Sequence, residues 1–260
     1  MTERLDKVLA HHGLGTRNDV KKLLRRATVT VNGARVTDPG ARIDLLHDAL
    51  MVDGAPLHLQ RDQYLMMNKC AGVVCSTRGG VHRTVFDLLH ETSGRREPIA
   101  ALHTIGRLDC DTEGLLLLTT DGALTHRLIS PRTHVPKTYA VRLRDHVDAR
   151  VKADYVRRFA LGLHVPREGN ACAFDAQSAA LSWLDGSAAV DDVTLRNAAG
   201  CDCLLTIYEG KFHQVRRMFT AVGNEVAYLK RVAVGALLLD PALAVGGWRA
   251  LTSAELGLLP

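Results

Sequence analysis

Apolar residues recur at two different spacings along the 260-residue chain, and each spacing predicts a different kind of element. In the first thirty residues they recur every three or four positions, which is the spacing of one helix face. A first helix is expected to begin with Thr2 as its cap and to end at Gly13. A second is expected after Thr16, where Asp19 completes a capping box. The two predicted inward faces are Leu5, Val8 and Leu9, and Val20, Leu23 and Leu24.

Two short alternating segments, residues 28–31 and 34–36, follow these helices and are separated by Asn32-Gly33. Asn-Gly between two such segments is typical of a two-residue hairpin turn. The order helix, helix, hairpin therefore describes a small module. We place this module at residues 1–58, because a proline and a polar stretch interrupt the pattern before the next strand.

The larger module, residues 59–260, alternates short strands with short helices. Strands are expected at residues 64–68, 73–76 and 115–118, and a helical turn at 85–89. This irregular alternation favours antiparallel strands over repeated βαβ units. The expected class is α+β, with a small N-terminal module of helices and strands before a mostly antiparallel mixed sheet flanked by helices. No G-x-G-x-x-G or Walker sequence follows a strand, which argues against a nucleotide cofactor.

The loop predicted at residues 103–113 carries several charged side chains, with Asp109 near its centre. Asp109 has three interpretations. It is a turn residue that bonds backbone amides, which is a common role for aspartate. It binds a cation together with Asp111 and Glu113, although Thr120 stands where a calcium loop needs a bidentate glutamate. The third interpretation is a nucleophile or general base beside an arginine.

Residues 130–144 are predicted to begin as a basic loop and to continue as a strand. Arg132 and Lys137 lie in the basic part, and Tyr139 lies at the start of the strand. Tyr139 either packs its ring at the sheet edge or offers a stacking platform to an unpaired base. Stacking of a base is favoured by nearby cations, which this segment provides.

A strand, a turn and a helix are predicted within residues 204–223. Arg216 and Arg217 lie in the first turns of that helix. A cation near a helix N-terminus opposes the helix dipole. The placement therefore indicates an anionic partner for these arginines, either a phosphate or a buried carboxylate.

The charge of the chain favours a polyanionic partner, since the net charge is +5 and the pI is about 9.0. The outward face of the second predicted helix carries Arg17, Lys21, Lys22, Arg25 and Arg26. Such a run is often only a solvated face. Because like charges one turn apart repel each other, an acidic partner would stabilise this helix, and we interpret the face as RNA-binding. Spacing alone does not distinguish RNA from DNA.

The chain begins without a signal peptide, and its apolar runs are too short to cross a bilayer. We therefore expect a soluble, cytoplasmic protein, and a monomer. The six cysteines show no C-x-x-C spacing, which argues against a zinc site. We predict reduced thiols, most of them buried.

Three segments in a fixed order carry a resemblance to a known family. They are Gly106-Arg107-Leu108-Asp109 with Asp111-Thr112 and Gly114-Leu115, Ser130-Pro131-Arg132 with Lys137-Thr138-Tyr139, and Glu209-Gly210 with His213-Gln214-Val215-Arg216-Arg217-Met218. Over nearly its whole length the chain resembles bacterial pseudouridine synthases of the RsuA group, which modify small-subunit ribosomal RNA. The module in front resembles the S4 RNA-binding domain. The Lys-Thr-Tyr element points to the small-subunit enzymes rather than to their large-subunit relatives, and Cys70 stands where the family usually has proline.

The resemblance implies roles for four residues. Asp109 is the essential catalytic aspartate, Tyr139 stacks on the target uracil, and Arg216 pairs with Asp109. Arg107 takes the place of the extruded nucleotide in the RNA stack. Uracil is detached from the ribose and rejoined without net oxidation or reduction, so no cofactor and no metal are expected. The implied partner is ribosomal RNA or an assembly intermediate of the small subunit.

Further cations of the larger module are assigned to RNA contact, and with Arg107 the set is Arg132, Lys137, Lys211 and Arg217. Three alternatives remain open. One is a large-subunit ribosomal RNA synthase of the same family. Another is a non-catalytic RNA-binding assembly factor, against which the intact set of Asp109, Tyr139 and Arg216 argues. The last is magnesium-dependent phosphoryl chemistry at the carboxylates of residues 109–113, which activity in EDTA would exclude.

Overall fold

The computed structural model describes residues 2–45, 47–57, 62–77, 80–93, 102–130, 132–185 and 191–260. The chain divides into two compact units, and the first gives way to the second between Gln63 and Tyr64. The domain ranges 1–58 and 59–260 stay a prediction, because residues 58–61 lie outside the described part of the chain.

The described elements of the N-terminal unit include the predicted order helix, helix, hairpin, with one further strand before it and three after it. In chain order they are β1 (Thr2–Arg4), α1 (Leu5–His11), α2 (Arg17–Arg26), β2 (Val29–Val31), β3 (Ala34–Arg35), β4 (Arg42–Asp44), β5 (Leu50–Val52) and β6 (Ala55–Leu57). The capping box of α2 is confirmed, since Thr16 and Asp19 exchange side-chain to backbone hydrogen bonds. The expected cap at Thr2 is wrong: Thr2 pairs with Asp44 in an antiparallel ladder, so the backbone is extended there and α1 begins at Leu5.

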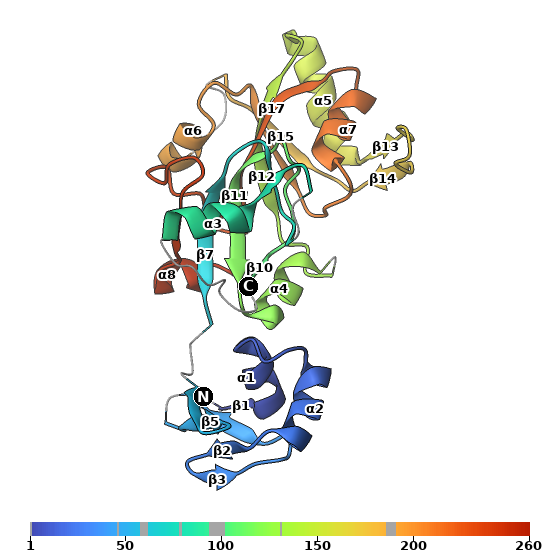
Figure 1. The fold of residues 1–260 in the computed structure, drawn as a ribbon. Coiled ribbons are helices and arrows are strands. Elements are labelled where there is room, and N and C mark those ends of the chain that lie inside the picture. The colour runs from blue at the N-terminus through green and yellow to red at the C-terminus, as the bar shows by residue number, and fades with distance from the viewer. Residues whose placement is uncertain are drawn as a thin grey trace. The chain divides into compact units, whose positions relative to one another are not determined.

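The predicted hairpin is present between β2 and β3. Asn32 and Gly33 have φ angles of 51° and 82°, the left-handed conformation that a two-residue hairpin turn requires. β2 and β3 join β5 and β6 in an antiparallel sheet of order β3-β2-β5-β6. The two helices pack against this sheet, as Figure 1 shows, through a core that includes the predicted Leu5, Val20 and Leu24.

The larger unit begins with β7 (Tyr64–Lys69), β8 (Val73–Val74), β9 (Arg83–Thr84), α3 (Val85–Ser93), β10 (His103–Thr104), β11 (Glu113–Thr119), α4 (Gly122–Ile129), β12 (Lys137–Leu143) and α5 (Ala149–Leu161). It continues with β13 (Leu163–Val165), β14 (Phe174–Ala176), β15 (Ala180–Trp183), α6 (Asp192–Asn197), β16 (Cys203–Ile207), α7 (Gln214–Ala221), β17 (Val226–Val234), β18 (Leu237–Leu238), β19 (Trp248–Ala250) and α8 (Ser253–Gly257). The predicted strand at residues 73–76 is shorter than expected, and the predicted helical turn at 85–89 is a full helix.

One mixed sheet organises this unit. Among the described residues its main path is β15-β16-β12-β17-β11-β7-β19, with β10 paired to β11 and β18 to β17. β12 runs antiparallel to both of its neighbours, whereas β11 and β17 are parallel. The expected α+β class is thereby confirmed.

The two faces of the sheet have different surroundings (Figure 1). α5 and α7 lie on one side, where Phe159 and Phe219 pack with ring centroids 5.0 Å apart. α6 lies on the other side, where Ala198 after it joins Ala140 and Val232 in a small core. No described helix has the length and apolar composition that a membrane crossing requires.

The cysteines are free, as expected, but they are not mostly buried. Cys203 is buried in β16, Cys172 is exposed, and the other four are half-buried. Burial raises the pKa of the Cys201 thiol to about 11. The cysteines are spread over loops and strand ends, where a thiol is only partly covered.

Candidate active site

The loop between β10 and β11, which carries Asp109, is held by a buried lysine of β7. Lys69 is 0 % exposed, and its Nζ donates to the carbonyl oxygens of Cys70 (3.1 Å), Asp109 (3.0 Å), Cys110 (3.2 Å) and Thr112 (2.8 Å). Burial lowers the pKa of Lys69, because the charged ammonium is desolvated. The carbonyl groups offset that cost and fix the course of the loop.

Sequence reasoning did not single out Lys69. The available signal was a charged residue directly after the apolar strand segment 64–68. Cys70 accepts one of the hydrogen bonds of the lysine with its carbonyl oxygen. The backbone at this position is therefore part of the loop's support.

Gly114 brings β11 against β17 beside this loop. Its φ of 99° lies in the left-handed region, and a Cβ here would meet the carbonyl oxygen of Arg231 at 2.2 Å. Only glycine allows this close approach without strain. The parallel pairing of Gly114 with Arg231 therefore joins the strand after the Asp109 loop to the strand that carries Arg231.

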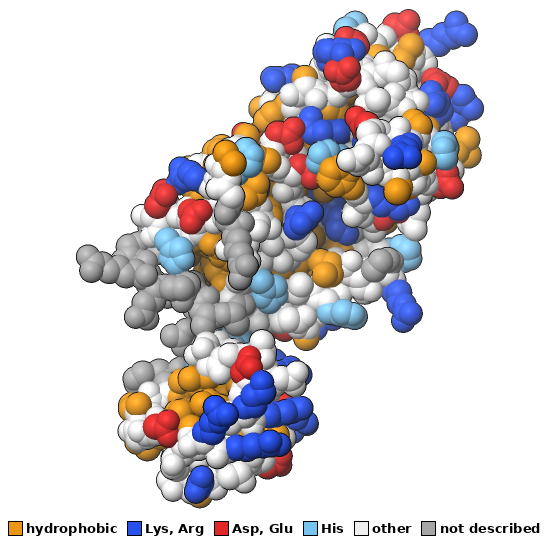
Figure 2. Space-filling view, turned by 45° about the vertical axis from the view of Figure 1, so that its right-hand side comes forward, with side chains coloured by type: hydrophobic (Ala, Val, Ile, Leu, Met, Phe, Trp, Pro, Cys, Tyr) orange, Lys and Arg blue, Asp and Glu red, His pale blue; other side chains and the backbone are white. Residues whose placement is uncertain are grey.

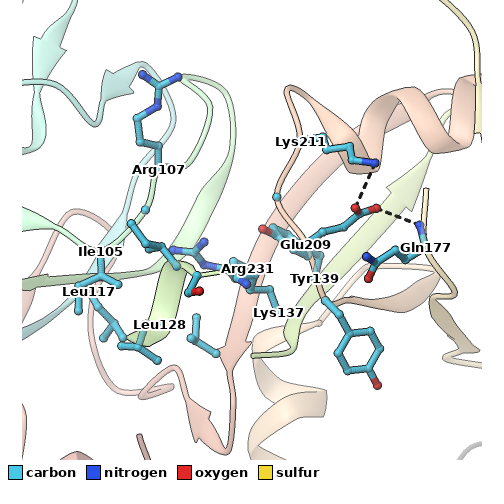
Figure 3. Close-up of a pocket in the computed structure, with 16 residues that line it drawn as sticks. Ile105, Arg107, Leu117, Leu128, Lys137, Tyr139, Gln177, Glu209, Lys211 and Arg231 are labelled. Atoms are coloured by element: carbon cyan, nitrogen blue, oxygen red, sulfur yellow. Dashed lines mark hydrogen bonds and ion pairs between the residues drawn. The ribbon is translucent and has the colours of Figure 1, made fainter. Parts of the chain in front are cut away.

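Two adjoining hollows open beside the Asp109 loop and the turn that leads into α7. The smaller has a volume of about 80 Å³, and Arg107, Asp109 and Tyr139 all line it. The larger, of about 340 Å³, is shown in Figure 3. Arg107, Tyr139 and Lys211 line both, so the hollows form one connected site.

Tyr139 lies inside the sheet rather than at its edge. β12 is an interior strand, and Tyr139 pairs with Leu205 on β16 and with Arg231 on β17. Only 8 % of Tyr139 is exposed, and that part faces the hollows. This position is compatible with a stacking platform and rules out the sheet-edge interpretation.

His213 is the side chain that pairs with the Asp109 carboxylate. Its Nε2 lies 3.7 Å from Asp109 Oδ1, and its ring stacks on Phe212 with centroids 3.8 Å apart. His213 has a φ of 48°, a strained conformation for a residue other than glycine. The third sequence motif contains this histidine, but sequence reasoning gave its side chain no role.

The expected ion pair between Arg216 and Asp109 is wrong. Arg216 Nη2 lies 2.9 Å from Asp111 Oδ2, and Arg216 Nη1 donates to the carbonyl oxygen of Val226. In the loop held by Lys69, the two aspartates point toward different residues near the N-terminal end of α7. Asp109 faces His213, and Asp111 faces Arg216.

Arg217 was assigned to RNA contact, and the structure contradicts that assignment. It is 4 % exposed, and its Nη2 donates to the carbonyl oxygens of Pro166 and Cys172 at 2.8 Å each. Its guanidinium also lies 4.7 Å from the Phe174 ring centroid. The two hydrogen bonds of Nη2 tie α7 to the segment between β13 and β14, whereas the buried Nε has no hydrogen-bond partner among the described residues.

The anionic partners inferred for these two arginines are carboxylates. Asp111 pairs with Arg216, and Glu168 lies 3.5 Å from Arg217. The phosphate alternative is therefore not needed for either residue.

The other predicted RNA-contact residues of this unit differ in their surroundings. Lys137 is half-buried in the larger hollow, and its Nζ donates to the carbonyl oxygen of Val135. Lys211 is exposed, and its Nζ lies 3.2 Å from Glu209 Oε2. Arg107 is exposed at both hollows, whereas Arg132 is exposed but lines neither.

The cation-site interpretation of Asp109, Asp111 and Glu113 has no geometric support. Glu113 accepts a hydrogen bond from Tyr228 Oη at 2.7 Å, and burial together with this bond raises the pKa of Tyr228. Within the described part of the chain, no group of three or more His, Cys, Asp or Glu side chains is placed to hold a metal ion.

The N-terminal unit carries its own basic surface, which we call the α2 face and define as Arg17, Lys21, Lys22, Arg25 and Arg26. All five side chains are exposed. Figure 2 shows Lys and Arg side chains gathered on this unit. The nearest carboxylate on the helix is Asp19, 3.8 Å from Lys22, and an exposed pair of this kind contributes little. The cations of the α2 face are thus available to bind a polyanion.

Two family models match the chain. The model described as RNA pseudouridylate synthase matches residues 63–221, and the S4 domain model matches residues 3–48. The two matches together span most of the chain.

Curated relatives match nearly the whole chain. A Bacillus subtilis protein named uncharacterized RNA pseudouridine synthase YtzG is 40% identical over 98% of both chains. The ribosomal small subunit pseudouridine synthase A of Escherichia coli K12 is 38% identical over 97% of this chain and 98% of its own. That of Vibrio vulnificus is 37% identical over 97% of each.

Among solved structures, one described as a pseudouridylate synthase is 35% identical and covers 99% of both chains, with a TM-score of 0.61. The similarity therefore includes the elements that surround Asp109 and Tyr139, as well as the N-terminal unit.

Proposed function

Since the chain belongs to the RNA pseudouridylate synthase family, and so is an RNA pseudouridine synthase, we propose that it converts one uridine of small-subunit ribosomal RNA to pseudouridine. The small subunit is favoured over the large one by the curated relatives, two of which are ribosomal small subunit pseudouridine synthases A. The substrate is the ribosomal RNA itself or an assembly intermediate of that subunit, and the reaction then takes place in the cytoplasm. In this proposal the protein acts as a monomer.

The observation that carries the proposed catalytic roles is the small hollow that Asp109, Tyr139 and Arg107 share. It offers a carboxylate, an aromatic ring and an exposed cation to one ligand. Uracil is flat and uncharged, so a ring that is largely buried on one side is a suitable stacking partner. Asp109 is the catalytic aspartate of the proposal, and Tyr139 stacks on the target base.

The reaction breaks the bond between N1 of uracil and C1′ of ribose and forms a bond between C5 and C1′, while C5 loses its proton and N1 gains one. A base inside a helix cannot turn in this way, so it must leave the stack, which costs a few kcal/mol. Arg107 is exposed at the mouth of both hollows, where its side chain can fill the space that the base leaves. Stacking on Tyr139 offsets the rest of the cost.

Asp109 must be ionised to act as a nucleophile or base. Lys69 supports its backbone, and His213 faces its carboxylate at 3.7 Å. Arg216 acts on the same loop through Asp111, so it is a positioning residue in this proposal. The α2 face adds affinity through phosphates, which carry little sequence information.

Pseudouridine mapping tests the proposal. Ribosomal RNA of both subunits is treated with wild-type protein or with Asp109→Asn, labelled with carbodiimide and read by primer extension. We expect one new stop on small-subunit RNA with wild type and none with the variant. A stop that Asp109→Asn also produces would refute the catalytic role of Asp109, and a stop only on large-subunit RNA would refute the substrate.

A matched control is Asp175→Asn. Asp175 is an exposed aspartate of β14 that pairs with His164 and lines neither hollow. Its variant should modify RNA at the wild-type rate.

A further inference from the structure

Arg231 is a buried cation in the wall of the larger hollow. It is 4 % exposed, and its Nε donates to the carbonyl oxygen of Leu115 at 2.8 Å. Among the described residues, no hydrogen bond or ion pair engages its terminal guanidinium nitrogens, and Figure 3 shows the side chain beside Lys137 in the hollow. A guanidinium whose terminal N–H groups face a hollow can donate them to a ligand bound there.

The charges that line the hollow do not balance. The cations are Arg107, Lys137, Lys211 and Arg231, and the one carboxylate among the described lining residues is Glu209. The Glu209 carboxylate already has partners inside the protein. It forms an ion pair with Lys211 and accepts hydrogen bonds from the backbone N–H of Gln177 and the side chain of Gln214. Within this described lining, the exposed Arg107 and the more buried Lys137 and Arg231 are left without a counter-charge.

Two of these cations, Lys137 and Arg231, lie close enough to influence each other. Burial lowers the pKa of Lys137, and the charge of Arg231 lowers it further. Repulsion between neighbouring cations is relieved when an anion lies between them. The charges that line the hollow therefore favour the binding of a negatively charged group.

RNA offers one kind of anionic group, the phosphodiester. The guanidinium fork binds two oxygens of a phosphate at once, and an ammonium adds a point charge. The remaining walls of the hollow include Ile105, Leu117 and Leu128, which suit the apolar parts of a nucleotide. Because the hollow shares Arg107 and Tyr139 with the cavity of Asp109, the nucleotide bound here is close to the target.

We propose that Arg231 and Lys137 bind a phosphodiester of the substrate RNA next to the target uridine, an inference that rests on the proposed function. Arg231 lies on β17, and the parallel pairing of Gly114 with Arg231 holds this part of the strand against β11. The phosphate draws the RNA strand across the hollow, so the target base is presented to Asp109 in one register.

The test uses the full chain and a short RNA that contains the mapped uridine. The phosphodiesters nearest that uridine are replaced one at a time by uncharged methylphosphonates. We expect one replacement to weaken binding to wild type by roughly ten- to a hundredfold. Arg231→Gln should bind the unmodified RNA more weakly by a similar factor, and should be insensitive to that replacement.

Lys137→Met provides a second variant, since Lys137 is only half-buried and its replacement threatens folding less. Lys230→Met is the matched control, because Lys230 is the β17 neighbour of Arg231, lines neither hollow, and lies 3.4 Å from Asn197. It should stay as sensitive as wild type to the replacement. Thermal melts of each variant distinguish a protein that fails to fold from a folded protein that fails to bind the phosphate.

The proposal is overturned if no methylphosphonate weakens binding to wild type, or if Arg231→Gln and Lys137→Met stay as sensitive as wild type. Inorganic phosphate separates the two sources of the anion. If it raises the Tm of wild type but not of Arg231→Gln while every methylphosphonate is tolerated, the ligand is free phosphate and the RNA contact is refuted. If the wild-type protein modifies no ribosomal RNA, the proposed function is refuted. The methylphosphonate and phosphate measurements then decide only whether Arg231 and Lys137 bind an anion.

Discussion

At the scale of single residues, the loop of Asp109 is held by side chains that do not line the small hollow. Lys69 binds the backbone carbonyl oxygens, and Arg216 binds the carboxylate of Asp111. Asp111 is 64% exposed, so its ion pair contributes little to stability. The pair therefore matters for the placement of the loop more than for folding.

A double-mutant cycle on Asp111→Asn and Arg216→Met measures this placement. We expect each change to lower kcat by up to about a hundredfold, because a misplacement on the order of 1 Å can have that effect. The double variant should be no worse than the single ones, since both remove the same ion pair. Unfolding midpoints in urea should move little.

Glu168→Gln is the control for this cycle. Its carboxylate is also 64% exposed and lies near Arg217, away from the hollows. It should leave kcat unchanged. A normal kcat for Asp111→Asn beside a low one for Arg216→Met would mean that Arg216 acts through another residue.

At the scale of elements, the junction of β11 and β17 decides the shape of the site. These two strands are parallel, whereas β12 is antiparallel to both of its neighbours, and the pairs β15–β16 and β7–β19 are antiparallel as well. β11 leads out of the Asp109 loop, and β17 carries Arg231. The two strands approach closely at Gly114, where an added Cβ would meet the carbonyl oxygen of Arg231.

Gly114→Ala should disrupt this junction. The new Cβ would meet the Arg231 carbonyl oxygen at 2.2 Å in a left-handed backbone. Strain and overpacking together should lower the free energy of unfolding by about 2 to 5 kcal/mol, measured by urea titration. Gly122→Ala, where a Cβ meets nothing within 4 Å, should change it by less than about 1 kcal/mol. Equal effects of the two changes would refute this account of the junction.

At the scale of the whole molecule, the N-terminal unit carries the basic α2 face, and the larger unit carries the candidate active site. The α2 face lies outside both hollows, whereas four cations of the larger unit, Arg107, Lys137, Lys211 and Arg231, line the larger hollow. We infer that the first unit supplies affinity and the second supplies chemistry. Affinity through phosphates depends strongly on salt, whereas turnover of bound RNA does not.

Replacing Lys21, Lys22 and Arg25 with Gln in the full chain tests whether the α2 face supplies affinity and not chemistry. Binding should weaken, and the slope of log Kd against log salt should fall by about 0.7 to 0.9 for each phosphate that the variant no longer neutralises. The kcat at saturating RNA should stay at the wild-type value. Unchanged binding and slope would mean that the α2 face is only solvated.

The predictions from sequence that succeeded concern neighbours along the chain. The capping box at Thr16, the turn at Asn32-Gly33 and the loop before Leu115 all follow from residues within a few positions of one another. Such features depend on local hydrogen bonds and on apolar periodicity, which a sequence displays directly. The start of α1 was misplaced because a strand from residues 42–44 pairs with Thr2.

The family and the candidate role of Asp109 were thus readable from motifs, while the partners of the charged side chains were not. Arg231 donates to Leu115 across 116 residues, and Arg217 donates to carbonyl oxygens 51 and 45 residues away. Arg216 pairs with Asp111 rather than Asp109 because the loop, held by Lys69, turns each aspartate in a different direction. Local spacing determined the elements and the candidate residues, whereas burial and long-range packing, which only the tertiary structure contains, decided which charges meet.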